Sequence, residues 1–172
     1  TLSITDVAVT EENSGMVNAV FTVSLSAASS ETVTVDYATA DGTATAASDY
    51  IAKAGSLIFA PGVTVQTVTV LVNGDMVAEL NEAFSVTLRN AVNATIAKSQ
   101  GTGTIANDDS VSLSITDVAV TEGNSGTVNA VFTLSLSAAN SQTVTVEYAT
   151  GDGTATAGTD FVAKSGSLSF AP

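Results

Sequence analysis

The sequence predicts an all-β protein made of immunoglobulin-like seven-stranded antiparallel β-sandwiches in tandem, with the second copy truncated. Three observations predict this fold class. The chain repeats itself at a constant offset of 111 residues, and 47 of the 61 positions aligned between 1–61 and 112–172 are identical. Valine, threonine, alanine, serine and glycine dominate the composition, which favours strands over helices. Apolar and polar residues alternate along short segments that turn-forming residues separate.

The first two strands of the repeat are expected at 2–9 and 16–26, because successive side chains of a strand face opposite sides. In 16–26 every second residue is apolar over the whole length, which makes this the clearest strand of the chain. In 2–9 the apolar pattern changes phase between Ile4 and Val7. This change indicates a β-bulge or a change of sheet near Asp6.

The remaining five strands follow from the same alternation and end at glycine, asparagine, aspartate or proline residues. No segment has the length and periodicity of a helix. The expected strands, in order, are 32–38, 55–60, 64–72, 83–89 and 101–106. Their inward-facing apolar residues are expected to be Val33, Val35, Tyr37, Leu57, Phe59, Val68, Val70, Val72, Phe84, Val86, Leu88 and Ile105.

A repeat of this length has the size of a whole small domain rather than of a solenoid unit. Residues 1–110 are therefore expected to form one complete sandwich, and residues 111–172 the N-terminal part of a second, incomplete one. A half sandwich exposes a core face and open strand edges. Segment 62–110 could complete either half, because the halves are nearly the same sequence. Local pairing is expected to win, with strand exchange or self-association between chains as a hazard.

Charge and residue content disfavour several classes of function. Seventeen acidic and four basic residues give a net charge of −13, which repels phosphate backbones and anionic lipids, so neither nucleic acid binding nor direct membrane insertion is expected. The absence of cysteine and histidine removes disulfides, the usual zinc sites and catalysis that uses these side chains. A glycosidase with two carboxylates is disfavoured by the scarcity of aromatic residues for sugar stacking. We therefore expect no enzymatic activity.

Antiparallel strands bring most of the acids to one end of the first sandwich. If consecutive strands alternate in direction, segments 11–12, 40–53, 73–82 and 107–110 meet at the same end, here called the acidic pole. Nine of the twelve acids of residues 1–110 fall there. They are Glu11, Glu12, Asp41, Asp49, Asp75, Glu79, Glu82, Asp108 and Asp109.

Such crowding of carboxylates needs a counter-charge, since like charges about 4 Å apart repel by roughly 1 kcal/mol in water and by more near a low-dielectric surface. Lys53 alone cannot supply it. Ca²⁺ takes about six to eight oxygen ligands from flexible loops, and converging carboxylates and carbonyls offer such ligands. The sequence therefore predicts a calcium site at the acidic pole. Its predicted ligands are Glu11, Asp49, Asp75, Glu79, Asp108 and Asp109.

A simpler interpretation is that these acidic loops only keep the protein soluble and form turns. Asp41-Gly42 and Asn73-Gly74 are common turn dipeptides. For Asp41 and Glu82 we expect turn and solvent-facing roles rather than metal binding, because these roles are the common ones for acids.

The chain also resembles the Calx-beta domain family. The resemblance is carried by DGTATAASDY (41–50), GSLIFAPG (55–62), NEAFSVTL (81–88) and GTIANDD (103–109), and the second copy repeats two of them as DGTATAGTDF and GSLSFAP. It implies a seven-stranded sandwich of the kind found in the regulatory loop of sodium/calcium exchangers, in an integrin cytoplasmic tail and in tandem arrays of bacterial surface and secreted proteins. The near-identity of the two copies is most similar to the bacterial arrays.

The resemblance implies the same ligand set as the acidic pole does. It assigns calcium ligands to a glutamate of the first loop, to the aspartate of the SDY segment, to an acidic run with a following glutamate after the fifth strand, and to a closing acidic triplet. Glu12 competes with Glu11 for the first role, but the second copy keeps Glu122 and has Gly123 next to it, which favours Glu11. The implied ligands are Glu11, Asp49, Asp75, Glu79, Asp108 and Asp109.

This chain departs from the strongest calcium binders of the family at two places. Asn73-Gly74 stands where consecutive acids are expected, and Asn107 replaces the first acid of the closing triplet. Fewer carboxylates mean fewer or weaker sites, so one or two ions of modest affinity are expected, suited to millimolar calcium outside cells.

The expected function is that of a calcium-binding structural repeat in a large extracellular or cell-surface protein of the adhesion type, with neighbouring repeats as partners. Asp108 and Asp109 lead directly into the second copy, so an ion bound there would stiffen the junction between repeats. The alternatives are a metal-free spacer and a calcium-sensing regulatory domain. The second copy keeps only Glu122, Asp152 and Asp160 at its pole and is not expected to hold calcium by itself.

Overall fold

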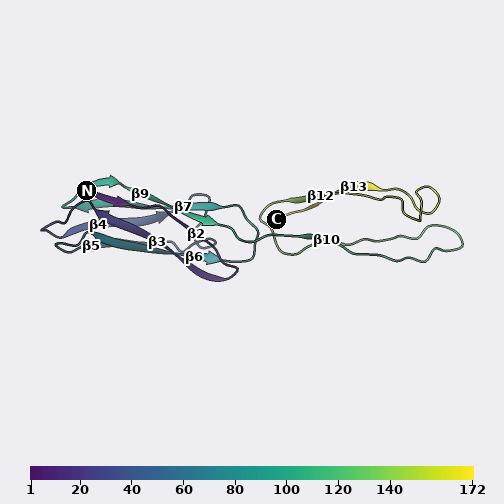
Figure 1. Ribbon diagram of the computed structural model, residues 1–172, viewed down its shortest axis with the longest axis horizontal. Coiled ribbons are helices and arrows are strands. Elements are labelled where there is room, and N and C mark those ends of the chain that lie inside the picture. Colours follow the sequence, from purple (N-terminus) through teal and green to yellow (C-terminus); the bar gives the residue numbers. More distant parts are fainter. The chain divides into compact units, whose positions relative to one another are not determined.

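A computed structural model describes residues 1–172 and contains strands, turns and bends (Figure 1). No helical segment of sufficient length and hydropathy to traverse a lipid bilayer occurs in it. Contacts between residues divide the chain into two compact units, of which the first comprises 1–76 and 80–109 and the second comprises 77–79 and 110–172. The predicted all-β fold class is confirmed, and the first unit is a β-sandwich of two sheets.

The first unit has nine strands rather than seven. The expected strand 2–9 is two strands, and the short strand β8 was not predicted. The strands are β1 (Leu2–Ile4), β2 (Val7–Thr10), β3 (Gly15–Leu25), β4 (Val33–Ala40), β5 (Ala54–Phe59), β6 (Val65–Gly74), β7 (Glu82–Val92), β8 (Ile96–Lys98) and β9 (Gln100–Ala106). One sheet has the order β6-β3-β1-β8 and the other the order β2-β9-β7-β4-β5.

The chain changes sheet at Asp6, where the apolar pattern changes phase. β1 pairs with β3 in the four-stranded sheet, whereas β2 pairs in parallel with β9 in the five-stranded sheet. Asp6 lies between β1 and β2 and accepts hydrogen bonds from Lys98 Nζ (2.8 Å) and from the Thr102 amide (2.9 Å). The predicted change of sheet near Asp6 is confirmed, and it divides the segment 2–9 into two strands, with a polar side chain anchoring the crossover between the sheets.

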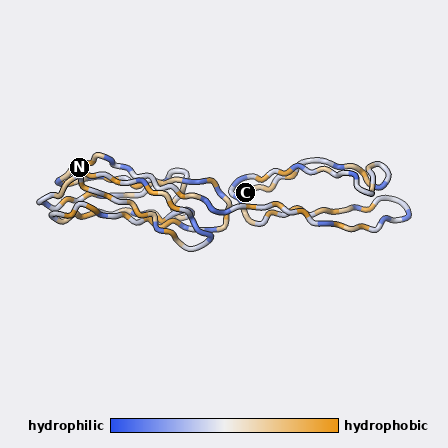
Figure 2. Tube along the Cα trace, viewed as in Figure 1, coloured by the Kyte–Doolittle hydropathy of each residue, from blue (hydrophilic) through white to orange (hydrophobic).

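The core lies between the two sheets and is built from the alternating apolar residues. Phe84 packs edge-on against Phe21, with ring centroids 5.9 Å apart, and stacks on Tyr50 at 4.5 Å. All three side chains are buried. Burying a large apolar side chain contributes about 1.5–3 kcal/mol, so this cluster alone is a large share of the stability of a small domain. Figure 2 shows the apolar and polar positions alternating along the strands.

The strand registers place the acidic loops at one end of the first sandwich. Thr10 at the end of β2 lies opposite Ala106 at the end of β9, and Gly15 at the start of β3 lies opposite Gly74 at the end of β6. Ala40 at the end of β4 pairs with the beginning of β7. The loops that follow β2, β4, β6 and β9 therefore meet at the same end, as the alternation of strand direction predicted.

The second unit holds strands without a closed sandwich. Its strands are β10 (Leu113–Ile115), β11 (Leu134–Leu136), β12 (Val144–Ala149) and β13 (Ser165–Phe170), which form the separate pairs β10-β11 and β12-β13. The counterparts of β2 and of most of β3 form no strand, because their partners in the first unit are β9 and β6, which this half lacks. Its core face is open: Phe132 is 50% exposed, whereas its counterpart Phe21 is 0% exposed.

The short connection between the repeats favours pairing of β6 to β9 with 1–61, which the structure shows, over pairing with 112–172. Completing the second half with these strands would require 107–112 to run from the acidic pole to the opposite end of the same sandwich, where β1 begins. The stretch from Thr10 back to Leu2 covers roughly 26 Å of strand, and the connection reaches only about 25 Å when fully extended. Local pairing needs no such fully extended connection.

Candidate metal centre

The loop after β4 is held together by its own hydrogen bonds. Asp41 accepts hydrogen bonds from the Ala46 amide (3.0 Å) and from the Tyr50 hydroxyl (2.5 Å). Burial, together with this bond to Asp41, raises the pKa of Tyr50 to about 12, so the hydroxyl remains a donor at neutral pH. Asp41 thus has the turn role expected for it, and the loop presents the next acid of the segment.

Asp49 is that acid, and its carboxylate is fixed in one orientation. Its Oδ2 accepts hydrogen bonds from the Thr45 amide (2.6 Å) and the Thr45 hydroxyl (3.2 Å). Burial raises the pKa of Asp49, but hydrogen bonds from Thr45 and Ser48, and one that Glu82 can donate only in its protonated form, outweigh burial, so that the pKa lies below its ordinary value. Asp49 is therefore ionised at neutral pH and positioned before any ligand arrives.

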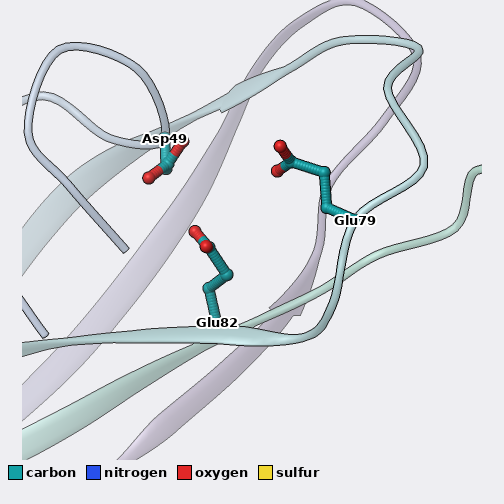
Figure 3. Close-up of side chains that lie close together, drawn as sticks. All are labelled: Asp49, Glu79 and Glu82. Atoms are coloured by element: carbon teal, nitrogen blue, oxygen red, sulfur yellow. The ribbon is translucent and has the colours of Figure 1, made fainter. Parts of the chain in front are cut away.

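Two glutamates meet Asp49. One carboxylate oxygen from each of Asp49, Glu79 and Glu82 lies within 4.8 Å of the others, and all three residues are half-buried. Figure 3 shows the three side chains pointing toward one another, Asp49 from the loop after β4, Glu79 from the β6-β7 connection and Glu82 from the start of β7. Three carboxylates at this separation repel one another unless a cation or a proton lies between them.

A second group of acids surrounds Asp109 at the end of the repeat. The Oδ2 atom of Asp109 is buried and has no hydrogen-bond partner. Burial raises the pKa of Asp109, and the charges of Asp108 and Asp75 raise it further. A buried carboxylate oxygen without a donor, beside two more acids, is unfavourable in a protein that binds no cation. These oxygens are the type of donor that a hard cation such as Ca²⁺ prefers.

Asn107 orders the closing segment that carries this second group. Its side-chain amide donates to the Asp109 carbonyl (2.8 Å), and its backbone amide donates to Oδ1 of Asn81 (3.1 Å). An aspartate at position 107 could not donate the first of these bonds, because a carboxylate only accepts. The replacement of an expected acid by Asn107 therefore exchanges a possible ligand for a fixed turn.

The structure brings some of the predicted ligands together and separates others. Asp49 and Glu79 share the three-carboxylate group, and Asp75, Asp108 and Asp109 influence one another outside it. Glu11 follows β2 and is 5% exposed, and its backbone amide donates to the carbonyl oxygen of Ala106 (3.1 Å).

Glu82 is the site residue that sequence reasoning missed, since it was expected to face solvent. Its spacing was the available signal. Glu82 follows Glu79 by three residues and is the first residue of β7, which begins at the acidic pole. Its side chain can therefore reach the same end of the sandwich as Glu79.

The structure also explains the glycine that stands where the family resemblance implies an acid. A Cβ atom on Gly74 would overlap the carbonyl oxygen of Glu12, because the end of β6 packs directly against the chain that leads into β3. No side chain fits at this position without moving the backbone. Gly74 is therefore required by close packing.

The second repeat keeps the loop and lacks the rest of the centre. Asp160, the counterpart of Asp49, accepts a hydrogen bond from the Thr156 amide (2.8 Å), and Asp152 accepts one from the Ala157 amide (2.8 Å). The sequence of this half contains no counterparts of Glu79 and Glu82. We still predict that the second repeat does not bind calcium by itself.

The geometry can be compared with known proteins. The family model of the Calx-beta domain matches residues 1–109 and again residues 105–172. A curated relative, sodium/calcium exchanger 1 of Mus musculus, is 48% identical over 61 residues, which is 36% of this chain and 6% of the exchanger. The chain therefore corresponds to a small part of that exchanger.

Solved structures agree with this match. The apo-form Calx CBD1 domain is 28% identical, with a TM-score of 0.53, over 63% of this chain and 98% of that one. The calcium binding domain CBD12 of CALX1.1 is 26% identical, with a TM-score of 0.58, over 99% of this chain and 70% of that one. The second alignment includes both repeats, so it supports their arrangement as adjacent domains. With family matches over both repeats, the chain belongs to the Calx-beta domain family.

Proposed function

We propose that the acidic pole of the first repeat binds Ca²⁺. The observation that carries the proposal is the convergence of the carboxylates of Asp49, Glu79 and Glu82, each with one oxygen within 4.8 Å of the others. Membership of a family with a solved calcium binding domain supports it. Ca²⁺ accepts irregular sets of oxygen ligands, whereas Mg²⁺ demands near-octahedral geometry, so loops of this kind favour calcium.

Two groups of residues would hold the ions. Asp49, Glu79 and Glu82 would form one site, and Asp75, Asp108 and Asp109 would supply ligands for a second, where the buried oxygen of Asp109 lacks a donor. Glu11 remains a proposed ligand from the first loop. A bound ion would neutralise the carboxylates and link loops that are far apart in the sequence.

The proposed role is structural. Asp109 and β10 are separated by only a few residues, so an ion held at the end of the first repeat would restrict the motion between consecutive repeats. A site of modest affinity would be filled at the millimolar calcium concentration found outside cells. We therefore propose a calcium-stiffened repeat of a large extracellular or cell-surface protein of the adhesion type, without enzymatic activity. The extracellular location rests on the sequence alone.

Neighbouring repeats are the proposed partners. The open half of the second unit adds a further proposal, which is self-association or strand exchange between chains. Its exposed apolar side chains, among them Ile115 and Phe132, support this, since their counterparts Ile4 and Phe21 are buried in the first unit.

Thermal melting of the full chain tests calcium binding. Calcium in tenfold excess over its Kd stabilises the folded state by about 1.4 kcal/mol, and in hundredfold excess by about 2.7 kcal/mol. We expect Tm to rise in millimolar calcium relative to chelator, and to rise much less in magnesium. An unchanged Tm would favour the metal-free spacer, whereas saturation below micromolar calcium would favour a calcium-sensing domain.

A further inference from the structure

Asn73 at the end of β6 holds three consecutive carbonyl groups of the loop that carries Asp49. Its side-chain amide donates hydrogen bonds to the carbonyl oxygens of Ala47 (3.2 Å) and Ser48 (2.6 Å). Its backbone amide donates to the carbonyl oxygen of Asp49 (2.9 Å). One residue of the four-stranded sheet thus ties down the segment that leads into the candidate metal centre.

The segment that Asn73 holds is strained. Ala47 has a φ of +82°, in the left-handed region that a residue with a Cβ atom rarely adopts. Its counterpart in the second repeat is Gly158, with a φ of +89°, and glycine adopts this conformation freely. Ala47 therefore holds a conformation that is strained for alanine and unstrained for glycine.

Carbonyl oxygens that converge on one point are also ligands for calcium. At position 73 an aspartate, as the family resemblance implies, would turn a carboxylate toward the carbonyl oxygens of Ala47 and Ser48. A carboxylate cannot donate, so only a cation between these oxygens would make that arrangement favourable. The amide of Asn73 supplies N–H donors in the same place.

We propose that Asn73 is a positioning residue: in the calcium-free protein its side-chain amide binds the carbonyl oxygens that a cation would otherwise bind. It holds Ala47 in its strained conformation and keeps Asp49 directed at Glu82 before calcium binds. This inference deepens the proposed function, since it explains how a site with fewer acids than its relatives is ordered in advance. The loop that carries Asp49 is then ordered in this chain without calcium.

Three variants of the full chain test the proposal: Asn73→Asp, Asn73→Ala and the double variant Asn73→Ala with Ala47→Gly. In chelator, both single variants are expected to lower Tm by about 5 °C, because two hydrogen bonds are lost. Hydrogen exchange of the amides of residues 45–49 is expected to become at least about tenfold faster in both. The double variant is expected to recover slow exchange, since glycine removes the strain.

Calcium is expected to separate the two single variants. Asn73→Asp should regain its Tm and its slow exchange in millimolar calcium and bind one more ion than the wild type in titration calorimetry, whereas Asn73→Ala should gain no ion. The proposal is overturned if Asn73→Asp is as ordered as the wild type in chelator, or if both variants respond to calcium alike. A wild-type chain that binds no calcium would reject the proposed function instead, and the measurements in chelator would still decide the role of Asn73.

Discussion

Replacing Glu82 by glutamine should stabilise the calcium-free protein while weakening its response to calcium. In the calcium-free chain, Glu82 lies within 4.8 Å of the carboxylates of Asp49 and Glu79. Two unit charges at this distance repel by about 0.9 kcal/mol in water and by about 3.5 kcal/mol at an effective dielectric constant of 20. Glu82 either experiences this repulsion or takes up a proton to bond Asp49, and Glu82→Gln removes either cost. The residues are half-buried and partly screened, so a gain of about 1 kcal/mol is expected from the substitution.

The glutamine amide keeps a hydrogen bond to the ionised Asp49, which Glu82 can donate only with a proton on its carboxyl group. A gain of about 1 kcal/mol corresponds to a rise in Tm of about 4–8 °C for a domain of this size. In millimolar calcium the same variant lacks one carboxylate ligand. A tenfold loss of affinity would remove about 1.4 kcal/mol of calcium-dependent stabilisation. The expected result is therefore a higher Tm in chelator and a smaller rise on adding calcium.

Circular dichroism melting of the full chain, with chelator and with calcium, measures both effects. Asp41→Ala is the matched control. Asp41 lies in the same acidic pole but bonds the Ala46 amide and the Tyr50 hydroxyl, so its loss should lower Tm equally in both conditions. The reasoning is refuted if Glu82→Gln lowers Tm in chelator as Asp41→Ala does, or if it leaves the calcium-induced rise unchanged.

Three further predictions concern the fold. Phe21→Ala should cost about 3–5 kcal/mol in urea unfolding, whereas the identical change at Phe132, which is 50% exposed, should cost under about 1 kcal/mol; equal losses would contradict the open second half. Gly42→Ala should lower Tm, because its Cβ would overlap a carbonyl oxygen of β7, while Gly153→Ala, with open space around it, should leave Tm unchanged. The hydrogen bond from Lys98 lowers the pKa of Asp6, so the ionised Asp6 stabilises the fold at neutral pH. This stabilisation is lost as the pH falls below the ordinary pKa of aspartate and through the lowered pKa of Asp6. Asp6→Asn should therefore lower Tm at pH 7 and leave it unchanged at strongly acidic pH.

Most of the fold could be predicted from the sequence, because the sandwich depends on a period of two that is visible in the chain. The segment 16–26 became β3, and the phase change near Asp6 marked the crossover between sheets. β8 could not be predicted in this way, since three residues are too few to establish an alternation. The loss of strands in the second half follows from missing partners, which no local pattern records.

The candidate site was predicted only in part. The convergence of acids at one pole followed from strand direction, which placed Asp49 and Glu79 together correctly. Whether Glu82 belongs to the metal centre depends on how its side chain turns at the start of β7. The reason for a glycine at position 74 is the contact of its backbone with Glu12. These are tertiary contacts. Spacing along the sequence places Glu82 at the acidic pole but does not show which way its side chain turns.

Titration calorimetry of calcium into the full chain tests the central claim most directly. We predict binding of one or two ions to the wild type, with a Kd between micromolar and millimolar. A triple variant with Asp49→Asn, Glu79→Gln and Glu82→Gln should lose the tightest of these ions and keep its fold by circular dichroism. A wild type that gives no binding heat and no calcium-dependent Tm, or a triple variant that binds calcium as the wild type does, would contradict the assignment of this site.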